Sequence, residues 1–188
     1  MGRDFAVTRS KLETALVTDV DIERSQVARP IRVLFLCTKN SARSQMAEAL
    51  LAHEGGGRFE VASAGATPAM SVDPMTFEVL DQLGIDWRAH RPKGFDAIQS
   101  TEWEVVVTVC DRAREACPVL PGRPVFAHWS LEDPVEAPGT PEQRRPVFLK
   151  TAQDIRVSIR RFAALDFATE AEDELKATVN ACFGQIAR

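Results

Sequence analysis

The fold is decided by residues 31–44, which read IRVLFLCTKNSARS. The first part, Ile31–Leu36, is a short apolar run of β-forming residues, and it predicts a buried strand of a parallel sheet. Apolar residues return at helical spacing in Gln45–His53. The segment between them, Cys37–Ser44, therefore joins the end of a buried strand to the start of a helix.

The same alternation of strands and helices continues along the chain. Apolar runs bounded by turn residues predict three further strands, at Phe59–Ala64, Val105–Val109 and Pro124–Trp129. A helix is expected at Pro74–Leu83, and apolar spacing predicts an amphipathic helix from Phe148 to Phe162 and a last helix carrying Leu175 to Ile186. Strands that alternate with helices imply an α/β fold, with a parallel sheet covered on both faces.

The composition is that of an ordinary globular protein of 188 residues, of which 45% are hydrophobic and 27% charged. That length fits one domain plus an appendage. The formal net charge of −4 lacks the basic excess of a nucleic-acid binder. No apolar run approaches the roughly 18 residues that a membrane span requires. We therefore expect neither a nucleic-acid partner nor a membrane partner.

Residues 1–30 are expected to form an N-terminal extension to a domain at residues 31–188. A weak apolar stripe within Thr8–Gln26 is compatible with one surface helix, an interaction arm or disorder. The first residues, Met1–Ala6, contain no apolar signal region, so a cytoplasmic location is expected. In a reducing compartment, the four cysteines are interpreted as reactive or buried thiols rather than permanent disulfides.

The loop that begins at Cys37 predicts an oxyanion site. A loop between a strand and a helix curls its backbone N–H groups around one point, in front of the amino end of the helix, and such a nest binds a tetrahedral anion. The residues of this nest are Thr38, Lys39, Asn40, Ser41, Ala42, Arg43 and Ser44. The planar guanidinium of Arg43 is able to hold two of the anion's oxygens.

The same positive field predicts a lowered pKa for Cys37, which would make it a thiolate nucleophile near neutral pH. Ser44 is expected to donate a hydrogen bond to the sulfur. The alternative is a buried cysteine at a strand end with an arginine nearby by chance. A strand-to-helix turn followed by serine favours the functional interpretation.

Asp133 lies in a loop soon after the fourth strand, where parallel sheets present catalytic side chains. Its carboxyl group is a candidate acid for a leaving oxygen, and an Asp-Pro turn is the structural alternative. His128 is a candidate to line the site, whereas His53 is expected on a helix surface and His90 in a loop. No histidine pair has metal-ligand spacing, so no metal is predicted.

Cys110 ends the third predicted strand, and Cys117 follows seven residues later. If Asp111–Ala116 is helical, that separation corresponds to a rise of about 10.5 Å along the helix axis. A disulfide needs Cα atoms within about 7 Å of each other. The two are therefore either unrelated thiols or a redox pair whose oxidation unwinds the segment. Cys182 lies on the apolar stripe of the last helix and is expected to be a buried packing residue.

Together these residues resemble the thioredoxin-coupled arsenate reductases, which share the fold of the low-molecular-weight protein tyrosine phosphatases. The resemblance covers approximately residues 31–165. It rests on four motifs, which are Cys37-Thr38-x-Asn40-Ser41-x-Arg43-Ser44-Gln45-Met46-Ala47-Glu48, Ser63-Ala64-Gly65, Val107-Thr108-Val109-Cys110 with Cys117-Pro118, and His128-Trp129 leading to Asp133-Pro134. It implies a three-layer sandwich with a four-stranded parallel sheet flanked by helices, to which this chain adds helical segments at both termini.

The resemblance also implies a three-cysteine relay for the detoxifying reduction of arsenate to arsenite. Cys37 attacks arsenate, which Arg43 and the loop amides hold, while Asp133 protonates the departing oxygen. Cys110 then attacks Cys37 and leaves a Cys37–Cys110 disulfide, which Cys117 converts into a Cys110–Cys117 disulfide. Thioredoxin is the implied reductant, and a glutathione and glutaredoxin route is the alternative. No cofactor is expected.

Two lysines depart from the family pattern. Lys39 stands where many relatives have a small residue, so the loop is expected to be more cationic. Some members bind a potassium ion behind the loop through positions that match Asn40, Glu48 and Ser63, together with an aspartate at whose position Lys93 stands. The Lys93 ammonium group is expected to replace the ion, so no potassium dependence is expected.

Two other functions remain open at this point. A phosphatase acting on phosphotyrosine or a small phosphoester would use Cys37, Arg43 and Asp133 without the redox steps. An oxyanion-binding or partner-binding module would need no nucleophile and would use the N-terminal arm as its docking element. The pair Cys110 and Cys117 favours the reductase over the phosphatase, because hydrolysis needs no further thiol.

Overall fold

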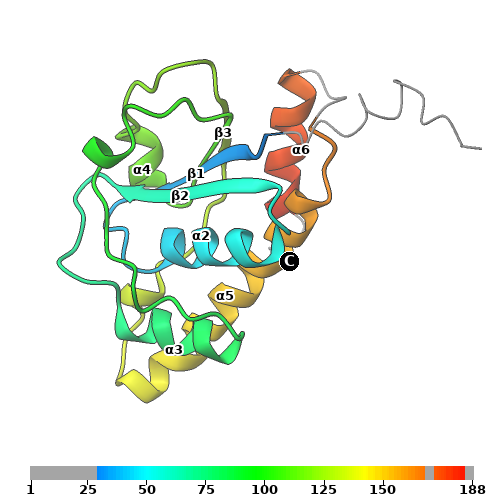
Figure 1. Ribbon diagram of the computed structural model, residues 1–188. Coiled ribbons are helices and arrows are strands. Elements are labelled where there is room, and N and C mark those ends of the chain that lie inside the picture. The colour runs from blue at the N-terminus through cyan, green and yellow to red at the C-terminus, as the bar shows by residue number, and fades with distance from the viewer. Residues whose placement is uncertain (1–28, 168–171, 185–188) are drawn as a thin grey trace, which may run out of the picture.

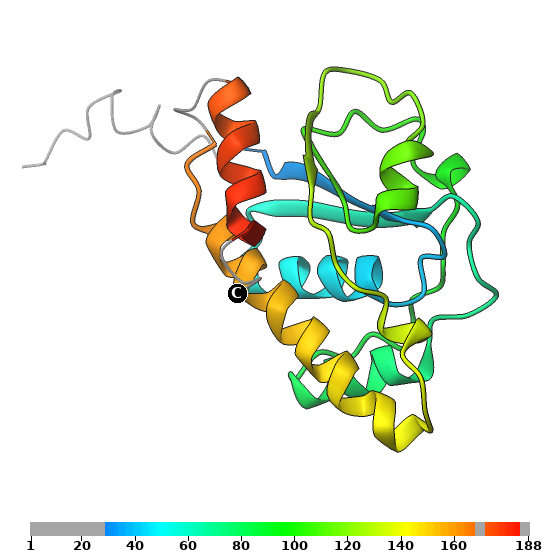
Figure 2. The same ribbon diagram turned by 180° about the vertical axis from the view of Figure 1, so that it is seen from behind.

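β1 (Ile31–Cys37) and β3 (Val105–Thr108) form the centre of a four-stranded parallel sheet. β2 (Phe59–Gly65) flanks β1 and β4 (Val125–His128) flanks β3, so the strand order is β2-β1-β3-β4. The computed structural model describes residues 29–167 and 172–184, which are drawn in colour in Figures 1 and 2. The predicted α/β fold with a four-stranded parallel sheet is confirmed.

Helices cover both faces of this sheet. They are α2 (Arg43–Glu54), α3 (Pro74–Gln82), α4 (Asp111–Glu115), α5 (Pro141–Ala163) and α6 (Glu172–Gly184). α2, α3 and α5 lie on one side of the sheet and α4 on the other (Figures 1 and 2). α6 packs against β4 and α5. Among the described residues, no helix is both long and apolar enough to span a bilayer.

The two central strands are buried on both faces, which explains their continuous apolar sequences. Every residue of β3 is buried, and so is every residue of β1 from Val33 onward. The register pairs Cys37 with Gly65, and it pairs Thr108 with Leu36 and His128. The carboxyl ends of the strands therefore meet at one edge of the sheet, and the loops that follow them converge there.

Helix α5 begins before its apolar stripe does. Thr140 and Gln143 form a capping box that starts the helix at Pro141. The stripe predicted for this helix is buried and consists of Phe148, Ala152, Ile155, Ile159 and Phe162. The last predicted helix is α6, and its buried residues include Leu175, Val179 and Cys182. The helix suggested within Thr8–Gln26, and Ile186 of the last stripe, lie outside the described residues.

Candidate active site

The loop between β1 and α2 closes around the sulfur of Cys37. The backbone N–H of Asn40 donates a hydrogen bond to Sγ over 2.9 Å, and the hydroxyl oxygen of Ser44 lies 2.9 Å from the same atom. Asn40 adopts the left-handed conformation, with a φ of 50°, that this tight turn requires. Only 3% of Cys37 is exposed. The thiol therefore lies at the base of the nest that the sequence predicts.

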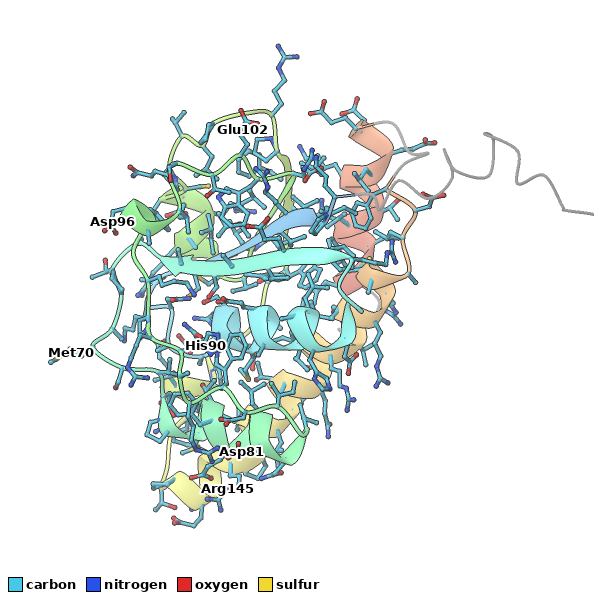
Figure 3. The ribbon with its side chains drawn as sticks, in the orientation of Figure 1. Met70, Asp81, His90, Asp96, Glu102 and Arg145 are labelled. Atoms are coloured by element: carbon cyan, nitrogen blue, oxygen red, sulfur yellow. The ribbon has the colours of Figure 1, made fainter. Side chains whose placement is uncertain are left out.

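Gly65 allows the loop to approach the end of β2. A Cβ at this position would lie 2.7 Å from the carbonyl oxygen of Thr38 and 2.9 Å from the backbone nitrogen of Asn40. Backbone N–H groups within residues 66–69 then donate hydrogen bonds to loop carbonyls over 2.8 to 3.1 Å. Met70, next along this segment, is fully exposed and points away from it (Figure 3). The segment after β2 therefore supports the backbone of the loop from outside.

The Asn40 side chain is the centre of a buried hydrogen-bond network behind the loop. Its amide nitrogen donates to the hydroxyl oxygens of Ser44, over 2.9 Å, and Ser63, over 2.7 Å. Its amide oxygen accepts from the backbone N–H of Lys93 over 2.7 Å and from the side chain of Gln45 over 3.0 Å. With these bonds made in four directions, the Asn40 amide fixes the loop to β2 and to the segment before β3.

Lys93 also contributes its charge to this network. Its Nζ lies 3.1 Å from both carboxylate oxygens of Glu48. Glu48 is buried, and it also accepts a hydrogen bond of 2.5 Å from the hydroxyl of Ser63. The ammonium group therefore neutralises the buried carboxylate behind the loop, as expected from the position of Lys93 in the sequence.

Arg43 and Asp133 meet at the mouth of the loop. Arg43 is the first residue of α2, and its guanidinium donates to the carboxylate of Asp133 over 2.5 Å and to the carbonyl of Leu131 over 2.8 Å. The other carboxylate oxygen of Asp133 accepts from the backbone N–H of Val135 over 3.1 Å. Two residues predicted from separate motifs are thus in direct contact, and the arginine fork is held in place by the carboxylate.

A hollow of about 290 Å³ opens over these groups. It is lined by Thr38, Lys39, Arg43, Cys110, Asp111, Arg112, Leu131, Asp133 and Glu136. The sulfur of Cys110 lies 3.4 Å from the hydroxyl oxygen of Thr38. The fold therefore places Cys110 beside the oxyanion loop, together with the arginine and aspartate predicted for the site.

Burial has the largest influence on the pKa of the Cys37 thiol, and it raises that pKa. The hydrogen bonds from Ser44 and from the Asn40 amide lower the pKa, as does the charge of Arg43, whereas Cys110 raises it. The net direction is upward, so the prediction of a lowered pKa was wrong for this structure. The positive groups are present, but nearly complete burial disfavours the thiolate.

Helix α4 separates Cys110 from Cys117, which agrees with the helix expected between these two residues. Cys110 is the residue before the helix and is buried, whereas Cys117 follows the helix and is half-buried. Cys117 lines a different hollow of about 250 Å³ together with residues of β4 and α6. Burial raises the pKa of the Cys117 thiol. Cys37, Cys110 and Cys117 are free thiols, and Cys182 is buried on the apolar stripe of α6, as predicted.

The histidines lie outside the hollow over the loop. His128, a candidate to line the site, lines the hollow of Cys117 instead, because the end of β4 faces α4 and α6 there. His53 is exposed on α2, and His90 stacks on Trp87 in a loop with ring centroids 3.3 Å apart. Within residues 29–167 and 172–184, no cluster of three histidine, cysteine, aspartate or glutamate residues is placed to hold a metal.

Sequence reasoning missed the connection between Gln45 and Trp87. The indole N–H of Trp87 donates to the amide oxygen of Gln45 over 2.7 Å, and the Gln45 amide nitrogen donates to the carbonyls of Asn40 and Arg91 over 3.3 and 3.2 Å. Gln45 is part of the loop motif, which is a partial signal. Trp87 carries none, because it lies 42 residues away in the chain.

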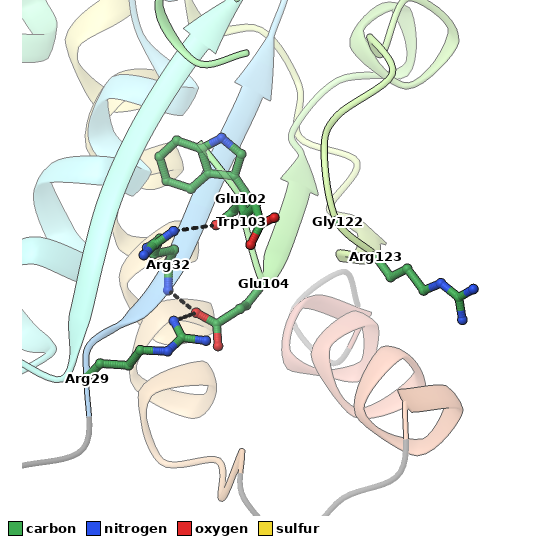
Figure 4. A pocket seen from close by; sticks show the side chains of 7 residues that line it. All are labelled: Arg29, Arg32, Glu102, Trp103, Glu104, Gly122 and Arg123. Atoms are coloured by element: carbon green, nitrogen blue, oxygen red, sulfur yellow. Dashed lines mark hydrogen bonds and ion pairs between the residues drawn. The ribbon is translucent and has the colours of Figure 1, made fainter. Parts of the chain in front are cut away.

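A third hollow, of about 390 Å³, lies at the opposite end of the sheet, near the amino ends of β1 and β3 (Figure 4). Arg29 donates to the carboxylate of Glu104 over 2.8 Å, and the backbone N–H of Arg32 donates to the same carboxylate over 3.0 Å. Figure 4 shows the side chain of Arg123 directed away from this group. This hollow has no cysteine or histidine in its lining, so its chemistry differs from that of the site at Cys37.

A thiol that accepts a hydrogen bond from a loop amide, six residues before an arginine that pairs with an aspartate, is typical of a cysteine-dependent oxyanion site of the phosphatase type. The family described as low molecular weight phosphotyrosine protein phosphatase matches residues 32–175. The chain belongs to this family, and the match ends within α6.

Several relatives carry a more specific name. The arsenate reductase of Halalkalibacterium halodurans is 35% identical to this chain over 131 residues, which are 70% of this chain and 94% of the relative. The structure of an arsenate reductase in a phosphate-binding state matches with a TM-score of 0.57 at 26% identity, and covers 71% of this chain and 97% of its own. A thioredoxin-dependent arsenate reductase of Corynebacterium glutamicum matches with a TM-score of 0.51 at 29% identity. The match covers 73% of this chain and 66% of the relative.

Proposed function

We propose that the protein reduces arsenate to arsenite with two electrons that pass through three of its cysteines. The observation that carries this proposal is the placement of two further thiols around α4: Cys110 beside the oxyanion loop and Cys117 after the helix. A reduction needs a second thiol that can attack the first, whereas hydrolysis does not. The names of the relatives support the same activity.

The first step forms a bond between sulfur and arsenic. The loop amides of Thr38 to Ser44 and the guanidinium of Arg43 hold the oxyanion, and the Cys37 thiolate attacks arsenic. The Asp133 carboxylate takes up the proton that the Cys37 thiol loses and passes it to an As–OH oxygen, which leaves as water. The hydrogen bond of 2.5 Å between Arg43 and Asp133 supports this assignment, because it brings the acid to the group that anchors the anion.

The second step transfers the electrons. The Cys110 thiolate attacks the sulfur of Cys37, a Cys37–Cys110 disulfide forms, and the S–As bond breaks with its electron pair going to arsenic. Arsenic leaves as arsenite, reduced by two electrons, and the two sulfurs are oxidised by two electrons. The contact of Cys110 with Thr38, which is the residue after Cys37, supports an attack over this short range.

The third step moves the disulfide away from the loop. The Cys117 thiolate attacks Cys110, a Cys110–Cys117 disulfide forms, and Cys37 leaves as a thiolate ready for the next cycle. Because α4 separates these two residues, the helix must unwind for the bond to form. A dithiol protein of the thioredoxin type then reduces the disulfide, and the name of the Corynebacterium glutamicum relative supports this reductant.

Arsenate-dependent oxidation of NADPH, coupled through thioredoxin and thioredoxin reductase, tests the proposal. The intact protein should turn over, and Cys117→Ser should lose nearly all turnover. Cys182→Ala is the matched control, because it removes a buried thiol of α6 outside the hollow over the loop, and it should keep turnover. Turnover with glutathione and glutaredoxin, but not with thioredoxin, would assign the other reductant.

A phosphatase is the second candidate. Cys37, Arg43 and Asp133 form a nucleophile, an anion anchor and an acid without help from either cysteine of the α4 segment. Arsenate and phosphate are nearly isosteric, so weak phosphatase activity is expected of a reductase too. A protein that hydrolyses a phosphoester through Cys37 and shows no arsenate-dependent NADPH oxidation would be a phosphatase instead.

A further inference from the structure

His128 connects three elements around the segment that carries Cys110 and Cys117. On its ring, Nε2 lies 2.9 Å from the carboxylate of Asp111, the first residue of α4, and Nδ1 lies 2.7 Å from the hydroxyl oxygen of Thr108 in β3. The backbone N–H of His128 donates to the side chain of Asn180 in α6 over 2.8 Å. The imidazole is thus a fixed point of the sheet, and α4 is bonded to it.

These contacts persist in either protonation state of the ring. With a neutral ring, the Thr108 hydroxyl donates to Nδ1, and Nε2–H donates to Asp111. With a charged ring, Nδ1–H donates to Thr108, whose hydroxyl hydrogen turns to the carbonyl of Ala127 at 3.4 Å. Each nitrogen keeps a partner because one hydroxyl can donate or accept. The hydrogen bond to Asp111 is therefore made with either a neutral or a charged ring.

Helix α4 has little else to hold it in shape. It has five residues, and a helix this short is not stable in isolation. Of its residues, only Ala113 is buried. The side chain of Asp111 is 69% exposed and that of His128 is 19% exposed, so this contact links a loosely held helix to a well-packed strand.

We propose that Asp111 and His128 form a latch that holds α4 in its helical, dithiol form, and that both are positioning residues for the step in which Cys117 attacks Cys110. The inference rests on the proposed cysteine relay. Asp111 is adjacent to Cys110, so it moves when the segment unwinds and its bond to His128 breaks. The latch therefore opposes the Cys110–Cys117 disulfide, and its loss favours the disulfide over the two thiols.

The test measures this redox equilibrium directly, without arsenate. The full chain is equilibrated with mixtures of reduced and oxidised dithiothreitol, free thiols are alkylated, and mass spectrometry gives the fraction with a Cys110–Cys117 disulfide. Formation of that bond reduces oxidised dithiothreitol by two electrons, so the ratio at half-oxidation reports the equilibrium constant. The variants are Asp111→Ala, His128→Phe, which keeps a ring of similar shape, and their combination.

Each single variant should shift the equilibrium about two- to fivefold toward the disulfide, as loss of a partly exposed ion pair or hydrogen bond would. In a chain that already carries Asp111→Ala, His128→Phe should have no further effect, because the histidine has lost its partner. The double variant therefore separates the contribution of the Asp111–His128 contact from the effect of the aspartate on the helix end. Asp111→Glu, which keeps the carboxylate, should stay near wild type. Glu115→Gln is the matched control, since it removes a carboxylate from the same helix without touching His128.

The latch is overturned if the single variants match the wild type, if the two effects simply add, or if Glu115→Gln shifts the equilibrium as far as Asp111→Ala. A wild-type protein that forms no Cys110–Cys117 disulfide at any ratio would overturn the cysteine relay and the latch with it. A wild-type disulfide with an equilibrium that the variants leave unchanged would overturn the latch alone. The two failures are therefore distinguishable.

Discussion

Arg43 and Asp133 lie 90 residues apart in the chain, and a hydrogen bond of 2.5 Å joins the guanidinium of one to the carboxylate of the other. Both side chains are largely buried, and the carboxylate is also held by the backbone N–H of Val135. The group that would anchor the oxyanion is thus already paired with an acid. A bound anion competes with Asp133 for Arg43, or shares it.

Replacing Asp133 with asparagine should separate binding from chemistry. A hydrogen bond to a charged group is worth about 1.5–3 kcal/mol, so release of Arg43 should lower the Kd for phosphate roughly tenfold or more. Turnover should fall about 10²- to 10⁴-fold, because the acid for the leaving oxygen is lost. Calorimetric titration with phosphate and the NADPH-coupled assay measure the two effects. Glu132→Gln, at the neighbouring exposed carboxylate, should change neither, and an unchanged Kd in Asp133→Asn would contradict the competition.

The raised pKa of Cys37 predicts how its reactivity depends on pH. In a chain whose other three cysteines are alanine, alkylation by iodoacetamide should be slower at pH 8 than in the unfolded chain, because burial disfavours the thiolate. The rate should rise beyond pH 9.0, the ordinary pKa of the thiol. Ser44→Ala should move the profile further up, since it removes a hydrogen bond that lowers the pKa. A profile centred below the ordinary pKa would show that the loop's positive field prevails over burial.

The same shift predicts a loss of stability in alkali. The folded chain keeps the proton on Cys37 to a higher pH than the unfolded chain does. Its contribution to the free energy of unfolding is therefore complete below the ordinary pKa and is lost as pH rises through the folded pKa. Urea unfolding at several pH values checks this, and Cys37→Ala should flatten the alkaline part of the dependence. An equal slope in both chains would contradict it.

The Lys93 ammonium beside Glu48 predicts that potassium has no effect. Turnover and the melting temperature should be equal in potassium and sodium chloride, because the buried carboxylate already has a cation 3.1 Å away. Lys93→Ala should lose about 2–3 kcal/mol of stability, less than a fully buried pair because Lys93 is partly exposed, and the loss should be smaller in potassium. Lys150→Ala, which breaks an exposed pair with Asp154, is the control and should cost under about 1 kcal/mol. Wild-type turnover that rises with potassium would contradict the replacement of the ion by the Lys93 ammonium group.

Gly65→Ala should displace the backbone of the oxyanion loop, because Gly65 lies against it. The added Cβ would lie within 2.7 to 2.9 Å of backbone atoms of Thr38 and Asn40, so the loop must move. We expect a cost of about 1–3 kcal/mol in the free energy of unfolding, as for other overpacked sites, and a clear loss of phosphate affinity. Urea unfolding and phosphate titration measure both. Ala66→Ser, at the next and exposed position, should leave both unchanged, and a Gly65→Ala chain with intact affinity would show that the loop tolerates the shift.

Local patterns predicted the elements that position the site. The run Ile31–Leu36, the turn at Cys37 and the helix after Ser44 carry their signals within a few residues, so their placement follows from periodicity and turn chemistry. The meeting of Arg43 and Asp133 was predicted only in outline, from the rule that loops after parallel strands share an edge. Its geometry depends on side chains that no local pattern specifies.

Other features depend on tertiary packing that periodicity does not encode. Burial raises the pKa of Cys37, whereas the sequence predicted a lowered pKa. The burial of this thiol is set by the whole loop and not by the residues next to the sulfur. His128, a candidate to line the site, lines the hollow of Cys117 instead, since the last residue of β4 faces α6, whose position against the sheet cannot be read from the helix sequence alone. The hydrogen bond between Trp87 and Gln45 likewise joins segments with no shared pattern.

Helix α6 packs against β4, the strand at one edge of the sheet. β4 is the last strand in the order, and Asn180 accepts the backbone N–H of His128 at that edge. The indole N–H of Trp129, a fully buried side chain, donates to the carbonyl of Val179 over 3.0 Å. A chain shortened to the end of α5 would lose both the acceptor of this indole N–H and part of the packing over Trp129, and it would uncover the edge strand β4. Such a chain would pair with its own copies through β4 and precipitate. By packing against β4, α6 therefore protects the protein from self-association.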